Sequence, residues 1–238
     1  MTEITISFDQ LTKVYGRKTI AVDNLTASVY SGRVTGFLGP NGAGKSTALR
    51  CLLNLVNPTS GTATIHGKTY RELPNASRVV GALLDSRGFH PGLTAHQNLI
   101  IMATSADIPR ARIEEMLDLV ELTSFRHKRT KSFSLGMKQR LSLAIALLGD
   151  PEVLVLDEPA NGLDPQGIAW LRNMLKQLAA AGKTILVSSH QLTEMQNTID
   201  DLIIINNGKL VKAGSMDEIC AGRSLEETFL SLTSQVKS

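Results

Sequence analysis

The stretch that decides the fold is Gly39-Pro40-Asn41-Gly42-Ala43-Gly44-Lys45-Ser46-Thr47. It fits the pattern G-x-x-x-x-G-K-[ST], it follows the short apolar run 33–38, and it precedes a helical pattern over 46–55. Glycines keep side chains away, so backbone N–H groups can surround a phosphate, and the N-terminus of the next helix adds partial positive charge. The stretch therefore predicts a strand–loop–helix unit that binds the phosphates of a nucleoside triphosphate.

Three side chains of this loop have predicted roles. Lys45 is placed to reach the β- and γ-phosphates, Ser46 to hold Mg²⁺ through its hydroxyl, and Thr47 to support neighbouring phosphate contacts. A glycine-rich turn would match the pattern by chance in roughly one chain of this length in a hundred. The strand pattern before the loop and the helical pattern after it make that alternative rarer still.

Two adjacent carboxylates follow a second apolar run. Residues 153–156 are Val-Leu-Val-Leu, and Asp157 and Glu158 come directly after them. Such a run predicts a buried strand that carries the acids to the carboxyl edge of a sheet, where open α/β sheets bind ligands. Asp157 is a candidate for holding Mg²⁺, and Glu158 for polarising the attacking water as a general base. Alone, such a run is as often a strand end with solvated acids, and the loop 39–47 favours the functional interpretation.

Hydrophobic patterns elsewhere indicate the fold class. Alternating apolar residues in 4–8 and 27–29 predict antiparallel strands, whereas the continuous runs 153–156, 184–187 and 202–205 predict strands buried on both faces. Helical patterns lie between these runs, over 46–55, 135–148 and 167–181. The chain is therefore predicted to be an α/β protein with a mostly parallel sheet and an antiparallel β subdomain.

From about residue 86 to residue 134 the strand signal disappears. Residues 94–106 and 110–120 carry helical spacing, and Thr94 is a candidate N-cap. We expect this stretch to form a helical subdomain inserted into the α/β core. The expected division of the single domain is a nucleotide-binding core at 1–85 and 144–214, a helical insert at 86–143, and a C-terminal tail at 215–238 without an assigned element.

Composition excludes several classes of protein. The net charge is +3, from 25 basic and 22 acidic residues, which is too balanced to indicate a nucleic-acid partner. The two cysteines form no C-x-x-C pair, so we expect reduced thiols rather than a metal site or a disulfide. No signal peptide is visible, and no apolar run approaches the roughly 20 residues of a membrane span. If the protein serves a membrane, we expect another chain to supply the spans.

Further segments resemble motifs of the ABC ATPases. The first, here called the signature segment, is Phe133-Ser134-Leu135-Gly136-Met137-Lys138-Gln139-Arg140-Leu141. It is similar to the L-S-G-G-Q signature of that family and the helix after it. Residues 159–164, Pro-Ala-Asn-Gly-Leu-Asp, resemble its D-loop, residues 188–190, Ser-Ser-His, resemble its switch histidine, and Tyr15 resembles the aromatic that stacks on adenine. With the two motifs above, they follow the family order over about residues 4–213.

The resemblance implies a P-loop NTPase core, ATP and Mg²⁺ as its ligands, and a pair of subunits. In the family, a serine and a glycine of the signature contact the γ-phosphate that the opposite subunit binds, and Ser134 and Gly136 occupy those positions here. Two copies, or one copy and a paralogous ATPase subunit, would therefore pair head-to-tail. Asp164 would cross that interface, and His190 would contact the γ-phosphate and the water near Glu158.

The chain departs from the family pattern in a few places. The family usually has a glutamine where its core joins the insert, and Asp85 occupies that position here. A carboxylate can still coordinate Mg²⁺, so Asp85 is a further candidate metal ligand. In the signature segment, Leu135 and Met137 replace the usual glycine and glutamine, and Gly162 replaces an alanine of the D-loop. Because Ser134 is retained, we expect phosphate binding to survive.

Asp85 and residues 134–141 resemble the same positions in ATPase subunits of bacterial exporters for peptide antibiotics. That group includes bacitracin and lantibiotic self-immunity systems. The resemblance implies that the protein hydrolyses ATP to ADP and phosphate at the cytoplasmic face of the membrane, as a peripheral subunit that drives a separate integral-membrane permease. The residues expected to touch that permease are Phe89, His90, Pro91 and Leu93. An alternative is a soluble mechanical ABC ATPase, although neither a second such domain nor long heptads occur here. A third possibility, an unrelated P-loop kinase or GTPase, leaves Ser134 and His190 unexplained.

Overall fold

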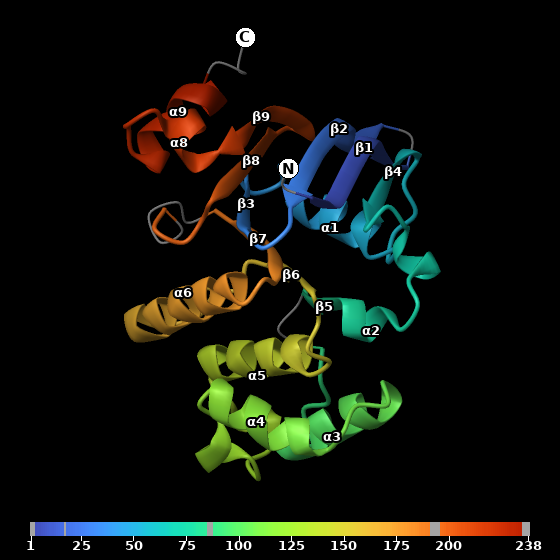
Figure 1. Cartoon of the computed structure of the whole chain (residues 1–238), viewed down its shortest axis with the longest axis vertical. Helices are drawn as coiled ribbons and strands as arrows, with labels where there is room; N and C mark the ends of the chain where they lie inside the picture. The colour runs from blue at the N-terminus through green and yellow to red at the C-terminus, as the bar shows by residue number, and fades with distance from the viewer. Residues whose placement is uncertain (1–2, 17, 85–87, 191–195, 235–238) are drawn as a thin grey trace.

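Figure 1 shows the computed structural model, which describes residues 3–16, 18–84, 88–190 and 196–234. Strands occupy its upper part, and three helices of the insert form a separate group below them: α3 (Ala95–Ser105), α4 (Ala111–Leu119) and α5 (Leu135–Leu147). Asp85, one of the predicted metal ligands, lies outside the described residues. In the part of the chain that the structure describes, no helix is both long enough and apolar enough to cross a membrane.

A six-stranded sheet forms the centre of the protein. Its spatial order is β5-β6-β7-β3-β8-β9, and the bounds are β3 (Val34–Leu38), β5 (Val80–Leu83), β6 (Val153–Asp157), β7 (Thr184–Ser189), β8 (Asp201–Asn206) and β9 (Lys209–Ser215). The first five strands in this order run parallel, and β9 pairs antiparallel with β8. Every residue of β3, β6, β7 and β8 is buried, as the continuous apolar runs predict.

A second, three-stranded antiparallel sheet lies beside the first. Its central strand is β1 (Ile4–Tyr15), which pairs with β2 (Thr19–Tyr30) on one side and β4 (Ser60–Ile65) on the other. The alternating apolar residues of β1 and β2 predicted the first pairing. The sequence pattern does not predict β4, because Ser-Gly-Thr-Ala-Thr-Ile has no apolar run and only its last residues are buried.

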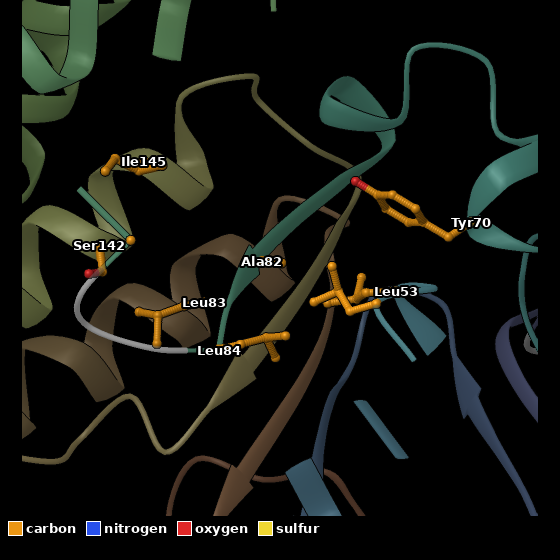
Figure 2. A pocket seen from close by; sticks show the side chains of 9 residues that line it. Leu53, Tyr70, Ala82, Leu83, Leu84, Ser142 and Ile145 are labelled. Atoms are coloured by element: carbon orange, nitrogen blue, oxygen red, sulfur yellow. The ribbon is translucent and has the colours of Figure 1, made fainter. Parts of the chain in front are cut away.

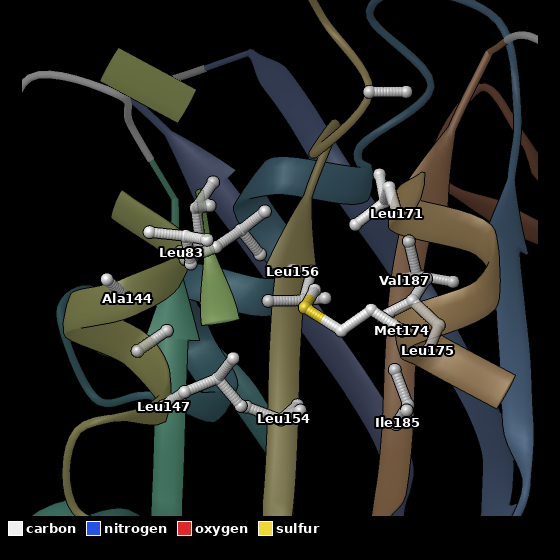
Figure 3. Packing of buried hydrophobic residues seen from close by; sticks show 14 of the residues in the cluster. Leu83, Ala144, Leu147, Leu154, Leu156, Leu171, Met174, Leu175, Ile185 and Val187 are labelled. Carbon is white, nitrogen blue, oxygen red and sulfur yellow. The ribbon is translucent and has the colours of Figure 1, made fainter. Parts of the chain in front are cut away.

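The two faces of the parallel sheet carry separate hydrophobic cores. Because side chains alternate along a strand, Leu154 and Leu156 of β6 point to one face and Val153 and Val155 to the other. On the first face they pack against α5 and α6 (Pro165–Ala180), including Met174, as Figure 3 shows. On the second face lie α1 (Lys45–Leu52) and the buried side of the antiparallel sheet. The predicted α/β fold with a parallel sheet, an antiparallel β subdomain and a helical insert is confirmed.

The helical segments follow the predicted pattern closely. Thr94 is the N-cap of α3, where its hydroxyl accepts a hydrogen bond from the N–H of Gln97 at 3.1 Å. The remaining short segments are 3₁₀ turns at Tyr70–Glu72, Thr123–Phe125 and Thr130–Ser132 and helices α2 (Ala76–Val79), α8 (Met216–Cys220) and α9 (Leu225–Ser234). The last two lie in the tail for which the sequence predicted no element. The expected boundary between residues 143 and 144 falls within α5.

The insert is pressed against the core at Gly81 of β5. A Cβ atom on Gly81 would lie 2.0 Å from the carbonyl oxygen of Ala146 in α5 and 2.7 Å from the ring of Pro151. Backbone atoms of a helix cannot yield cheaply, so only glycine permits this contact between β5 and α5. The close approach fixes the last turn of α5 against the edge of the parallel sheet.

We therefore expect Gly81→Ala to lower the free energy of unfolding by about 2 kcal/mol or more, as overpacking of a well-packed core does. Gly182→Ala is the matched control, because its Cβ would meet open space and only its positive φ of 91° is unfavourable. We expect about 1 kcal/mol for the control. Urea denaturation measures both variants, and equal losses would contradict the steric explanation.

Candidate functional site

The loop 39–44 joins β3 to α1 and is held against neighbouring backbone at two glycines. A Cβ on Gly44 would lie 2.2 Å from the carbonyl oxygen of Ala21, and one on Gly39 would lie 2.6 Å from that of Ile205. Gly44 also has a φ of 103°, which side chains other than glycine disfavour. Gly39 and Gly44, predicted for phosphate access, are thus also required by the close packing of the loop, whereas a Cβ on Gly42 would meet no atom within 4 Å.

This loop and the start of α1 line an open cavity of about 230 Å³. Its lining residues are Ala21, Asn41, Gly42, Ala43, Gly44, Lys45, Ser46, Thr47 and Glu158. Gly44 caps α1 without a side chain, and the first turn carries no acidic residue. The N–H groups of that turn therefore have no side-chain acceptor, and an anion in the cavity would find both these donors and the positive end of the helix.

Lys45 brings a buried positive charge to the same place. Only 6% of its surface is exposed. Its Nζ donates hydrogen bonds to the carbonyl oxygens of Gly39 at 2.6 Å and Pro40 at 3.3 Å, and it lies 3.7 Å from Oε1 of Glu158. A buried ammonium needs anionic or carbonyl partners, and the cavity beside it offers room for phosphate oxygens to serve as such partners.

The two predicted acids sit at the carboxyl edge of the sheet. Asp157 ends β6, is 9% exposed, and accepts a hydrogen bond from the hydroxyl of Ser188 in β7. The parallel register places these two residues opposite each other. Ser46, which lines the cavity, offers a hydroxyl. A carboxylate and a hydroxyl are hard oxygen donors, so the side chains present fit Mg²⁺.

Glu158 lines the cavity with an unusual backbone conformation. Its φ is 51°, in the left-handed region that costs roughly 1 kcal/mol for a non-glycine residue. Its N–H donates to Oγ of Ser188 at 3.0 Å and to the carbonyl oxygen of that residue at 3.2 Å. Its Oε2 lies 2.8 Å from Nδ1 of His190. The structure therefore brings Lys45, Glu158 and His190 together, as the sequence predicted.

The other predicted site residues lie elsewhere in the chain. Ser134 caps α5 and accepts a hydrogen bond from the N–H of Met137 at 3.2 Å, and Asp164 caps α6 and accepts one from the N–H of Gly167 at 2.8 Å. Neither residue lines the cavity. Tyr15 is 41% exposed at the end of β1, with Nζ of Lys13 5.0 Å from its ring centre.

Two residues without a role predicted from the sequence also contact the site. Ser188 holds both Asp157 and Glu158, and it stands two residues before the predicted switch histidine. Gln139 of α5 donates a hydrogen bond from Nε2 to the carbonyl oxygen of Glu158 at 3.3 Å. The strand register could have identified Ser188. No local pattern identifies Gln139, because its contact depends on the packing of α5 against the sheet.

Comparison with known proteins supports these observations. The family model described as ABC transporter matches residues 22–161. The bacitracin transport ATP-binding protein BcrA of Bacillus licheniformis is 43% identical, over 90% of this chain and 71% of that protein. The lantibiotic transport ATP-binding protein SrtF of Streptococcus pyogenes is 36% identical, over 94% of this chain and 95% of that protein.

Solved structures share the same fold. The structure of an ATP-binding subunit of an ABC transporter has a TM-score of 0.86 and 27% identity, and the match covers 96% of this chain and 99% of that one. The dimeric post-hydrolysis state of the ATP-binding cassette MJ0796, bound to ADP and Pi, has a TM-score of 0.78 and 25% identity, over 89% of this chain and 98% of that one.

Two departures from the family pattern contact each other directly. Leu135 stands where the signature usually has glycine, and Gly162 stands where the D-loop usually has alanine. A Cβ on Gly162 would lie 2.3 Å from Cγ and Cδ2 of Leu135. The glycine in one segment therefore makes the space that the leucine in the other segment occupies.

We expect Gly162→Ala to lower the free energy of unfolding by about 2 kcal/mol, from the clash with Leu135 and from the positive φ at this position. In the double variant with Leu135→Gly the clash is absent, so the two losses should fall short of additivity by about 1 kcal/mol. Urea denaturation of the four proteins in this cycle measures the coupling, and strictly additive losses would show that the two residues do not compensate each other.

Proposed function

This chain belongs to the ABC transporter family, and we propose that it works as the ATPase subunit of an exporter, in a head-to-tail pair that drives a separate membrane permease. Its own activity is the hydrolysis of ATP. The observation that carries the proposal is the cluster of Lys45, Glu158 and His190 at a cavity that fits phosphate. We further propose that two subunits pair, that a permease docks on them, and that the exported compound is of a particular class.

Pairing is supported by the separation of the predicted phosphate contacts. The cavity is lined by residues 41–47 and Glu158, whereas Ser134 and Gly136 at the start of α5 do not line it. The start of α5 is exposed, with Ser134 as its cap, so its free N–H groups can face an anion outside the chain. A second copy turned by a two-fold rotation would bring its α5 to this cavity and complete two equivalent sites.

Within each site the side chains have distinct roles in the proposal. Lys45 exchanges its carbonyl contacts for the β- and γ-phosphate oxygens. Glu158 orients and polarises the attacking water, and His190 positions Glu158 and contacts the γ-phosphate. Ser46 and Asp157 would hold Mg²⁺, which supplies positive charge against the phosphates when it is bound. Asp85 is a further proposed ligand, and Tyr15 is the proposed platform for adenine.

The permease would dock at an apolar cavity between the core and the insert. This cavity has a volume of about 330 Å³, and its lining residues are Leu53, Leu55, Tyr70, Ala82, Leu83, Leu84, Gly88, Ser142 and Ile145. Figure 2 shows Ser142 and Ile145 of α5 on one side and Tyr70 on the other. Leu55 is 66% exposed, so the cavity presents a large apolar side chain to solvent beside its other apolar lining residues. An apolar segment of the permease would cover it.

The exported compound is proposed to be a peptide antibiotic or a similar drug. Two relatives that share 43% and 36% identity over at least 90% of this chain are named for bacitracin transport and lantibiotic transport. The proposed location is the cytoplasmic face of the membrane, where a peripheral subunit can reach both ATP and the permease.

Replacement of the proposed base tests the chemistry. We expect Glu158→Gln to lower ATP turnover by at least about 100-fold, because general bases contribute that much, while the affinity for ATP is retained. Phosphate release measures turnover, and a fluorescent ATP analogue measures affinity. Because the γ-phosphate would persist, size-exclusion chromatography should show this variant as a stable pair in Mg-ATP. Turnover equal to that of the unmodified protein would remove Glu158 from this role.

Introducing a charged side chain into the apolar cavity tests whether the permease docks there. We expect Leu55→Asp to abolish copurification of the permease from membranes and to leave ATP turnover of the isolated subunit unchanged, because burying an unpaired carboxylate is unfavourable. Leu230→Asp on α9 is the matched control, since Leu230 is 59% exposed and lies outside this cavity. If both variants retained the permease equally, this cavity would not be its docking site.

A further inference from the structure

Gln139 is a buried amide that links the signature segment to the site of its own chain. It lies on α5, it is 2% exposed, and its Nε2 donates a hydrogen bond to the carbonyl oxygen of Glu158 at 3.3 Å. We propose that Gln139 is a positioning residue that sets the orientation of Glu158 according to the position of α5. This inference rests on the proposed function, in which Glu158 is the general base and the start of α5 contacts the phosphate of the opposite site.

The backbone of Glu158 needs such a partner. The residue adopts a φ of 51°, which a non-glycine residue disfavours, so surrounding contacts must hold it there. Ser188 binds its N–H through both a hydroxyl and a carbonyl oxygen. Gln139 binds its carbonyl oxygen. The two contacts fix both ends of the residue, and the direction of its side chain toward the cavity follows from that fixed backbone.

The contact also joins two sites through one rigid element. Ser134 caps α5, and Gln139 follows it on the same continuous helix, which extends over Leu135–Leu147. A shift or rotation at the start of the helix therefore moves the amide of Gln139 with it. If Ser134 engages a phosphate of the opposite subunit, the geometry of the base in its own cavity responds. Each site would then sense whether the other site is occupied.

Arg140, the residue after Gln139, holds α5 in place through contacts of its own. The guanidinium of Arg140 lies 4.1 Å from the ring centre of Trp170 in α6, and its Nη1 donates to the carbonyl oxygen of Val120 at 3.1 Å. These contacts hold the helix in place without touching Glu158. Loss of the Gln139 amide should consequently leave α5 folded and disturb the base selectively.

The test compares Gln139→Leu with the unmodified protein in ATP hydrolysis. We expect turnover to fall by about 10-fold or more, because a small misplacement of a catalytic group has effects of that size, while KM for ATP stays within about two-fold. Thr228→Val is the matched control: Thr228 of α9 is 1% exposed, and its hydroxyl donates to the carbonyl oxygen of Ser224, the residue before that helix, without contact to Glu158. We expect the control to lose stability without loss of turnover.

A second measurement separates positioning from a general structural defect. In the Glu158→Gln background, the addition of Gln139→Leu should leave ATP-dependent pairing unchanged, because the effect of Gln139 on hydrolysis acts through the base. Loss of pairing in that double variant, or turnover of Gln139→Leu equal to that of the unmodified protein, would overturn the inference. Absence of ATP hydrolysis and pairing in the unmodified protein would instead refute the proposed function on which it rests.

Discussion

The buried ammonium of Lys45 is the interaction on which the arrangement of the site depends. It lies under the loop 39–44, bound to two carbonyl oxygens and 3.7 Å from a carboxylate oxygen of Glu158. A positive charge that is almost excluded from water is stable only with such partners. The loop is packed against the backbone of Ala21 and Ile205 at Gly44 and Gly39. Lys45 also lines the cavity, so an anion bound there would lie beside a positive charge.

Sheet order explains how distant parts of the chain reach that charge. The strands β6, β7 and β3 are neighbours and run parallel, so their carboxyl ends lie at one edge. Glu158 follows the first, His190 the second, and the loop 39–44 the third. The alternating side chains of these strands build one core against α5 and α6 and another against α1. Loss of either core would displace the carboxyl edge of the sheet, where the site lies.

Local sequence patterns predicted the individual helices and strands better than they predicted which elements pair or pack together. The runs 153–156 and 202–205 are apolar enough to be recognised as buried strands, and the pattern of residues 39–47 predicts both a loop and the phosphate that it would bind. The strand β4 has no such signal, because its position depends on pairing with β1. The contacts of Ser188 and Gln139 depend on strand register and helix packing, which no local pattern contains. The role of Asp85 as a metal ligand stays a prediction, since this residue lies outside the described residues.

The central claim is that one subunit's loop and its partner's signature segment hold the same phosphate. Cysteines introduced by Asn41→Cys and Leu135→Cys test it most directly, because both positions are exposed and lie within those two segments. With a short thiol cross-linker and Mg-ATP, we expect covalent pairs in denaturing electrophoresis, and far fewer without nucleotide. Cross-linking within single chains, or pairs that form equally well without ATP, would contradict the account.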